Sequence, residues 1–199
     1  MEDPKVNSIL DEGNRLFLQG KFCEAIIYYD KILDENPNHL SSLNNKGYAL
    51  SKLKDYDNAM KCYDVALQIS PNDLSVLVNK ISSFRKQGNL TEALQICNNI
   101  LKNNENYNIV LYHKERILFS MKNFDESISC CNKILDDYPE NGDVLFDKSC
   151  NFVMLSKNDE ALDLLEHAIA QSIQYKIKAK KSKVFEKLLD NPRFKKIIL

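Results

Sequence analysis

The stretch LNNKGYALSKLKDYDNAMKCYDVALQISP, residues 43–71, combines the features that decide the fold. Its apolar residues recur every three or four positions on both sides of a central turn, which is the pattern of two amphipathic helices. Small residues at Gly47 and Ala59 allow two helices to pack closely, and Pro71 ends the second helix. The stretch therefore predicts one antiparallel pair of helices.

The same features recur with a period of 34 residues. Pro37 precedes Pro71 by one period, and Pro139 follows it by two. The turn segments at this spacing are QGKFCEA (19–25), LKDYDNA (53–59), QGNLTEA (87–93), MKNFDES (121–127) and LSKNDEA (155–161). Self-similarity at such a period indicates stacked structural repeats.

We expect five helix pairs between residues 6 and 173, within a single domain that covers residues 1–199. The repeats are predicted at about 6–39, 40–73, 74–107, 108–141 and 142–175, with a capping and basic segment at 176–199. Short polar side chains after each turn are expected to cap the second helices, because they can accept hydrogen bonds from free N–H groups. These predicted caps are Asp57, Thr91, Asp125 and Asp159.

Small residues recur in two columns that we expect at the helix crossings. The column of the first helices is Gly13, Gly47, Ile81, Glu115 and Ser149, and that of the second helices is Ala25, Ala59, Ala93, Ser127 and Ala161. A turn later the second helices carry larger or apolar residues, namely Tyr29, Tyr63, Cys97, Cys131 and Leu165. Glu105 and Ile173 stand where the other repeats have proline.

A 34-residue unit with these small, aromatic and proline columns resembles the tetratricopeptide repeat family. The resemblance covers residues 6–173 and is strongest in the second unit, at Gly47, Ala59, Tyr63, Ala66 and Pro71. It implies an all-α fold, an α-solenoid of about five tetratricopeptide helix-turn-helix repeats with a C-terminal capping helix. It also implies a concave groove that holds a protein or peptide partner.

The fourth unit departs from the pattern, because Glu115 occupies a small-residue position opposite Ser127. Two interpretations stay open. In one, the crossing is slightly splayed and Glu115 reaches solvent. In the other, Ser127 forms a buried hydrogen bond with Glu115, since a buried acid needs a partner.

The carboxyl end is expected to cap the last repeat. We expect Phe185, Leu188 and Leu189 to pack on the second helix of the fifth pair, with the lysines turned to water. The contacts are predicted near Leu162, Leu165 and Ile169. Asn191 and Pro192 predict a helix stop followed by a short final helix.

Charge is distributed unevenly along the chain. Residues 174–199 contain nine basic and two acidic residues, whereas the whole chain has 27 basic and 28 acidic residues. A solvated helix face explains this run most simply. The alternatives are a basic surface for acidic lipid, RNA or an acidic protein, and attraction to the acidic remainder of the chain, in cis or in a dimer.

The six cysteines predict thiols in a reducing, cytoplasmic setting. They lie at Cys23, Cys62, Cys97, Cys130, Cys131 and Cys150, within apolar helical patterns and without C-x-x-C spacing. The amino terminus lacks the apolar core of a signal peptide, and no apolar run approaches the ~20 residues that cross a bilayer. We therefore expect a soluble chain with no membrane span.

The sequence offers no motif for catalysis. The three histidines lie outside zinc-binding motifs, the five glycines form no phosphate loop, and no G-x-S-x-G elbow occurs. We therefore expect no enzymatic activity, no cofactor, no metal site and no small-molecule substrate. Nucleic acid is an unlikely partner, because the chain carries no nucleic-acid motif.

The predicted groove is lined by side chains of the first helices that lie off the apolar stripe. Its principal residues are Asn14, Asn45, Tyr48, Asn79, Tyr112, His113, Arg116 and Phe146. Exposed amides can bond a peptide backbone, and aromatic rings can pack on an apolar anchor. The plainer interpretation is that these are ordinary surface residues without a ligand.

One branch of the family grips chaperone carboxylates with a clamp of asparagines and basic residues. Its asparagine positions match Asn14 and Asn45, but its basic positions hold Leu10, Ser75 and Asn79. Without cations the charge-assisted bonds are lost, which disfavours an adaptor for chaperone tails. The leading hypothesis is a protein interaction module. The alternatives are a self-assembling homo-oligomer and a regulatory domain of a larger protein.

Overall fold

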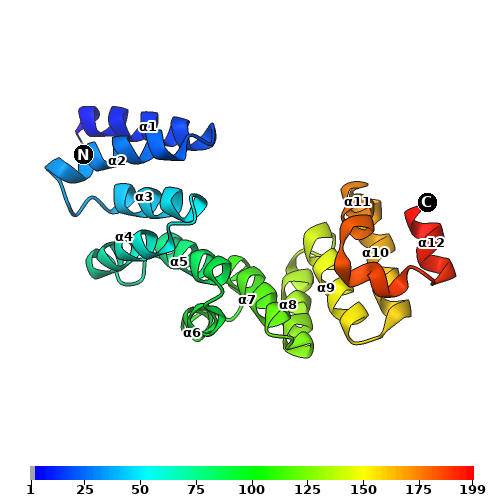
Figure 1. Ribbon diagram of the computed structural model, residues 1–199. Coiled ribbons are helices and arrows are strands. Elements are labelled where there is room, and N and C mark those ends of the chain that lie inside the picture. The colour runs from blue at the N-terminus through cyan, green and yellow to red at the C-terminus, as the bar shows by residue number, and fades with distance from the viewer. Residues whose placement is uncertain (1–2) are drawn as a thin grey trace. The chain divides into compact units, whose positions relative to one another are not determined.

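The computed structural model describes residues 3–199, and all regular structure within that range is helical. No strand occurs between these residues, so the all-α prediction is confirmed. The described residues divide into two compact units, one ending at Ile96 and the other beginning at Cys97 (Figure 1). A single domain over residues 1–199 stays a prediction.

The N-terminal unit is a series of antiparallel helix pairs. It contains α1 (Pro4–Leu18), α2 (Phe22–Glu35), α3 (Leu40–Lys52), α4 (Tyr56–Ile69), α5 (Leu74–Gln87) and the first part of α6 (Leu90–Leu101). From α1 to α5, each helix packs on the next, and the first helices α1, α3 and α5 also contact one another in order. The first helices therefore form a common face.

The C-terminal unit continues the pattern and adds a cap. After the end of α6 come α7 (Asn108–Ser120), α8 (Phe124–Asp137), α9 (Gly142–Met154) and α10 (Asn158–Gln171). The cap consists of α11 (Gln174–Lys181), a 3₁₀ helix η1 (Lys183–Leu188) and α12 (Pro192–Ile198). None of the helices between residues 3 and 199 is long and apolar enough to cross a membrane.

The turn inside each pair has the same backbone shape every 34 residues. Its last turn residue is left-handed, with φ between 61° and 93°, at Gly20, Lys54, Gly88, Lys122 and Ser156. Glycine adopts this conformation readily, whereas lysine and serine adopt it at a modest energetic cost. The repetition of this shape at non-glycine positions indicates that helix packing on both sides imposes the turn.

The predicted helix caps were wrong by two positions, because each is the second residue of its helix. Asp55 caps α4, because its side chain accepts a hydrogen bond from the backbone N–H of Asn58. Asp57, Asp125 and Asp159 lie inside the first turns of their helices, and Thr91 is the second residue of α6. Each helix begins earlier than predicted, and the three acids instead face the positive end of the helix dipole.

Glycine permits the close crossing of the first two pairs. A Cβ atom added to Gly47 would lie 2.6 Å from Cε1 of Tyr63, and one added to Gly13 would lie 2.8 Å from Cε1 of Tyr29. Both tyrosine rings are fully buried. The predicted small column therefore lies at the helix crossing in these two pairs.

In the fourth pair the first interpretation of Glu115 is wrong, and the second is confirmed in part. Glu115 is buried, with 1% of its surface exposed, so it does not reach solvent. Ser127 does donate a hydrogen bond to it, but to the backbone carbonyl oxygen, at 2.9 Å. The carboxylate Oε1 lies 3.3 Å from Nε of Arg116 and accepts no aligned hydrogen bond. Burial, and next the Asp147 carboxylate, raise the pKa of Glu115 to about 9.

The cap is built on stacked aromatic rings. The ring centroid of Phe185 lies 5.7 Å from that of Phe146 and 5.6 Å from that of Phe194. Phe185 and Leu188 share a core with Leu162 and Leu165, as predicted, although η1 packs chiefly on α9. The prediction for Leu189 was wrong, because it follows the end of η1 and is 53% exposed. Asn191 caps α12 through Arg193 and Phe194, as the sequence indicated.

We expect Phe185→Ala to destabilise the C-terminal unit by about 3–5 kcal/mol, because it removes a fully buried ring and leaves a cavity. Leu189→Ala is the matched control and should change the free energy of unfolding by less than about 0.5 kcal/mol. Urea denaturation of each variant measures both values. Equal losses in the two variants would contradict the packing of the cap.

We expect Glu115→Gln to remove a pH dependence of stability. The carboxyl pKa is about 9 in the folded state, whereas its ordinary value, which applies to the unfolded chain, is 4.5. Between these values the folded state holds a proton that the unfolded state has released, so stability falls as pH rises. The free energy of unfolding, measured from pH 5 to 9, should decline more steeply for the wild type than for Glu115→Gln. Parallel curves would contradict a buried neutral carboxyl, and Glu126→Gln, at an exposed position, should follow the wild type.

Candidate functional site: the face of the first helices

Asparagine pairs join successive first helices in the N-terminal unit. The amide nitrogen of Asn45 on α3 donates to Oδ1 of Asn14 on α1 at 2.8 Å. The amide nitrogen of Asn79 on α5 donates to Oδ1 of Asn44 on α3 at 2.9 Å. The expectation that Asn45 and Asn79 are free exposed amides was therefore wrong, because each already holds two helices together.

The Asn14–Asn45 pair forms one side of a pocket of about 250 Å³. Its other lining residues are Phe17, Leu18, Tyr29 and Tyr48. The Phe17 and Tyr48 rings lie 5.0 Å apart, and Leu18, at the end of α1, is 86% exposed. The hydroxyl of Tyr29 donates to Oδ1 of Asn14 at 3.0 Å. Burial raises the pKa of Tyr29 to about 12, so this hydroxyl keeps its proton.

Two polar atoms of this amide pair have no hydrogen bond to any residue between 3 and 199. They are the amide nitrogen of Asn14 and the amide oxygen of Asn45. Both residues are half-buried, so these atoms are within reach of solvent. One is a donor and the other an acceptor, which are the two groups that a peptide backbone complements.

Ion pairs replace the amide pairs in the C-terminal unit. Arg116 on α7 donates twice to Oδ2 of Asp147 on α9, at 3.0 and 2.8 Å. Lys178 on α11 donates to Oδ1 of Asp143 on α9 at 2.8 Å. The sequence separations are the same as in the amide pairs, 31 and 35 residues. Arg116 and Asp147 stand three repeats after Asn14 and Asn45, so this position is joined by a neutral contact in one unit and by a charged contact in the other.

The remaining predicted site residues of this unit differ in how accessible they are to a ligand. The guanidinium of Arg116 lies 4.3 Å above the Tyr112 ring, and that ring meets His113 edge-on with centroids 6.3 Å apart. Both aromatic residues are half-buried. Phe146 is buried in the cap, stacked 5.9 Å from Tyr175, and its ring cannot serve as a surface anchor. We therefore remove Phe146 from the candidate site.

Part of the C-terminal basic run pairs with the acidic body of the chain. Arg193 donates to Asp163 and Glu166 on α10, each at 2.6 Å, and Lys178 pairs with Asp143 as above. Other lysines of the run are exposed to solvent, including Lys180, Lys181, Lys183 and Lys187. Attraction in cis and solvation therefore both account for this segment.

The cysteines differ from the prediction in one respect. All six are free in the structure, but Cys23 is exposed and Cys62 is half-buried, whereas the other four are buried. Burial raises the pKa of the Cys97 thiol to about 12 and that of Cys130 to about 11, which leaves them unreactive. Within residues 3–199, no group of three or more potential metal ligands converges.

Sequence reasoning missed Phe17 and Leu18, which form the apolar wall of the pocket. Phe17 fits the apolar pattern of the first helix, and the end of that helix at Leu18 was not predicted. Leu18 stands directly before the turn residues Gln19 and Gly20, so an apolar side chain at a helix end was the available signal.

Comparison with known proteins supports the repeat. Residues 41–73 match the model of the tetratricopeptide repeat family. The fold is similar to that of YrrB, described as a TPR protein with an unusual peptide-binding site, with a TM-score of 0.66 and 18% identity over 87% of this chain and 91% of that chain.

Two further solved structures share the fold. A tetratricopeptide repeat protein from Parabacteroides merdae has a TM-score of 0.75 and 19% identity, over 97% of this chain and 82% of that chain. MamA from Desulfovibrio magneticus has a TM-score of 0.74 and 18% identity, over 86% and 97%. Residues 41–73 therefore match one tetratricopeptide repeat, and the described residues share the fold of solved tetratricopeptide repeat proteins.

Proposed function

We propose that the chain is a non-catalytic protein interaction module that binds a peptide segment of a partner on the first-helix face of its N-terminal unit. Tetratricopeptide repeats generally mediate protein–protein interactions and are typically non-catalytic. The observation that carries the proposal is the pocket beside Asn14 and Asn45, where an apolar wall adjoins one free donor and one free acceptor. We place this activity in the cytoplasm.

The pocket fits one apolar side chain of the partner. Phe17, Leu18 and Tyr48 present apolar surface, and a volume of about 250 Å³ is small compared with drug-sized pockets. Burial of such a side chain contributes roughly 1.5–3 kcal/mol. The amides of Asn14 and Asn45 then bond the backbone of the same residue, which fixes the direction of the peptide without selecting its neighbours.

The pocket chemistry argues against a charged anchor. All six lining residues are uncharged. The Nζ of Lys52 lies 5.0 Å from the Tyr48 ring centroid, in a cation–π contact with that ring. A carboxylate would lose its hydration here without gaining a charge-assisted bond. We therefore expect an internal peptide segment rather than a terminal carboxylate.

Selection from a phage-displayed library of random peptides tests this proposal. We expect selected peptides to share an apolar or aromatic residue, and Leu18→Asp to weaken their binding at least tenfold, because it places a charge in the apolar wall. Ile27→Asp is the matched control, since Ile27 is 55% exposed on α2 and does not line the pocket. Isothermal titration calorimetry measures both affinities.

Asn45→Ala should weaken the binding of the same peptides by about fivefold, which corresponds to the loss of one hydrogen bond. It also removes the contact to Asn14, so its melting temperature is measured in parallel. Peptides without a shared apolar residue, or equal effects of Leu18→Asp and Ile27→Asp, would contradict the pocket as the site.

Self-association is a second candidate, favoured by exposed apolar residues on the cap. Ile173, the residue before α11, is 63% exposed, and Ile177, four residues later on that helix, is 51% exposed. Sedimentation equilibrium at several concentrations tests this. A dimer that dissociates in Ile173→Ser/Ile177→Ser would support a homo-oligomer, whereas a wild-type monomer would exclude it.

A further inference from the structure

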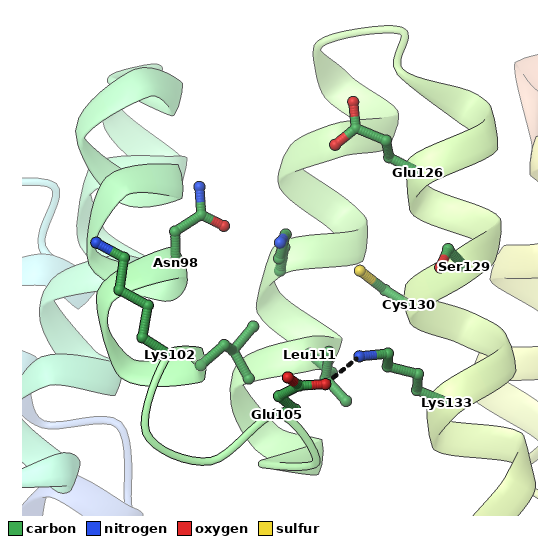
Figure 2. Close-up of a pocket in the computed structure, with 10 residues that line it drawn as sticks. Asn98, Lys102, Glu105, Leu111, Glu126, Ser129, Cys130 and Lys133 are labelled. Atoms are coloured by element: carbon green, nitrogen blue, oxygen red, sulfur yellow. Dashed lines mark hydrogen bonds and ion pairs between the residues drawn. The ribbon is translucent and has the colours of Figure 1, made fainter.

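A second cleft lies in the C-terminal unit. It is formed by the last turn of α6, the segment that follows it, α7 and α8, and it has a volume of about 430 Å³. Figure 2 shows Asn98 and Lys102 on one wall, and Ser129, Cys130 and Lys133 on the other. Each unit therefore has a pocket of its own.

Lysines outnumber carboxylates by three to two in the lining of this cleft. Lys102, Lys114 and Lys133 line it, together with Glu105 and Glu126. Lys133 pairs with Glu105 at 3.4 Å, but that carboxylate side chain is 80% exposed. An ion pair this exposed contributes little to stability, so Lys133 can readily exchange Glu105 for the carboxylate of a ligand. Glu126 lies toward the turn between α7 and α8, apart from Lys102 and Lys133 (Figure 2).

Two of the three lysines have no ion pair with any residue between 3 and 199. Lys102 donates only a long hydrogen bond of 3.5 Å to the amide oxygen of Asn99, and Lys114, which is half-buried, has no charged partner within 4.0 Å. Lys114 and Lys133 both act electrostatically on the thiol of Cys130, and Glu115 and Glu126 act on it with the opposite sign. Lys114 and Lys133 therefore both border the cleft near Cys130.

The floor of the cleft is apolar. Leu111 is 2% exposed and Cys130 is 6% exposed, and Leu101 lies beside them in the lining. Asn98 and Ser129 add neutral hydrogen-bonding groups at the rim. An occupant that matches this surface combines carboxylates with an apolar side chain.

We propose that this cleft binds an acidic peptide segment, with its carboxylates on Lys102, Lys114 and Lys133 and an apolar side chain over Leu111. A peptide fits better than a small anion, because lysines act as flexible point charges that do not orient one planar ligand. An extended segment instead brings several carboxylates to separate lysines. The proposal is independent of the peptide pocket in the N-terminal unit.

A blocked peptide of alternating glutamate and leucine, six residues long, serves as the probe. Its binding is measured by calorimetry and by NMR shifts of the backbone amides of Ser129 and Cys130. The same peptide with glutamine for glutamate should not bind. Lys114→Gln and Lys102→Gln should each weaken binding by about fivefold, because each removes one charge-assisted contact.

Glu105→Gln supplies the sharpest outcome, because it should strengthen binding about threefold by releasing Lys133. If these side chains had a purely structural role, the glutamate variant would not strengthen peptide binding while the lysine variants weaken it. Lys180→Gln/Lys181→Gln is the control for overall charge, since both lysines are exposed on α11, outside the cleft.

Three results would overturn the proposal. One is loss of binding in the Lys180→Gln/Lys181→Gln control, which would place the site on the basic terminal segment. Another is weaker binding by Glu105→Gln, and the third is the absence of any binding by the folded wild-type protein. Lys102 and Glu105 are exposed, so their variants keep the test valid even if Lys114→Gln fails to fold.

Discussion

The close contact between a glycine on one helix and a tyrosine ring on its partner is the constraint on which the repeat depends. With Tyr63 only 2.6 Å from where a Cβ of Gly47 would lie, no larger residue fits unless the helices separate. The ring fills the space between the helices and is fully buried. The crossing point fixes the register of the pair, and the register determines which residues of the first helix face outward.

The C-terminal unit meets the same constraint with other residues. In the fourth pair the glycine position holds Glu115 and the tyrosine position holds Cys131, so a larger side chain on one helix accompanies a smaller one on the other. Serine hydroxyls bind the facing backbone at these crossings, from Ser127 to the carbonyl of Glu115 and from Ser149 to that of Ala161. These bonds hold the two backbones close together. Burial at this crossing raises the pKa of Glu115, so its carboxyl group stays protonated at neutral pH.

The sequence predicted the helix pairs well because their determinants are local and repeated. The predicted repeat starts at 40, 74, 108 and 142 coincide with the first residues of α3, α5, α7 and α9. The side-chain pairing was not predicted, since it depends on contacts between residues 31 or 35 positions apart. Asn45 looked like an exposed amide because its partner, Asn14, belongs to another repeat. Phe146 looked like a groove residue because nothing local showed that Tyr175 and Phe185 would cover it.

Neutral and charged pairs at equivalent positions give the two first-helix faces different capacities. An amide side chain has both a donor and an acceptor. The hydrogen bond between Asn14 and Asn45 uses the nitrogen of Asn45 and the oxygen of Asn14, and it leaves the nitrogen of Asn14 and the oxygen of Asn45 for a ligand. Arg116 and Asp147 neutralise each other, and a ligand that competes for either must leave the other uncompensated. Replacement of Asn45 by a charged residue would therefore change the ligand preference of the N-terminal face. The face would then bind charged groups of a ligand rather than a peptide backbone. We infer that the choice between amide and ion pair at this spacing sets which face of the chain is open to a peptide, while the helix geometry beneath it stays the same.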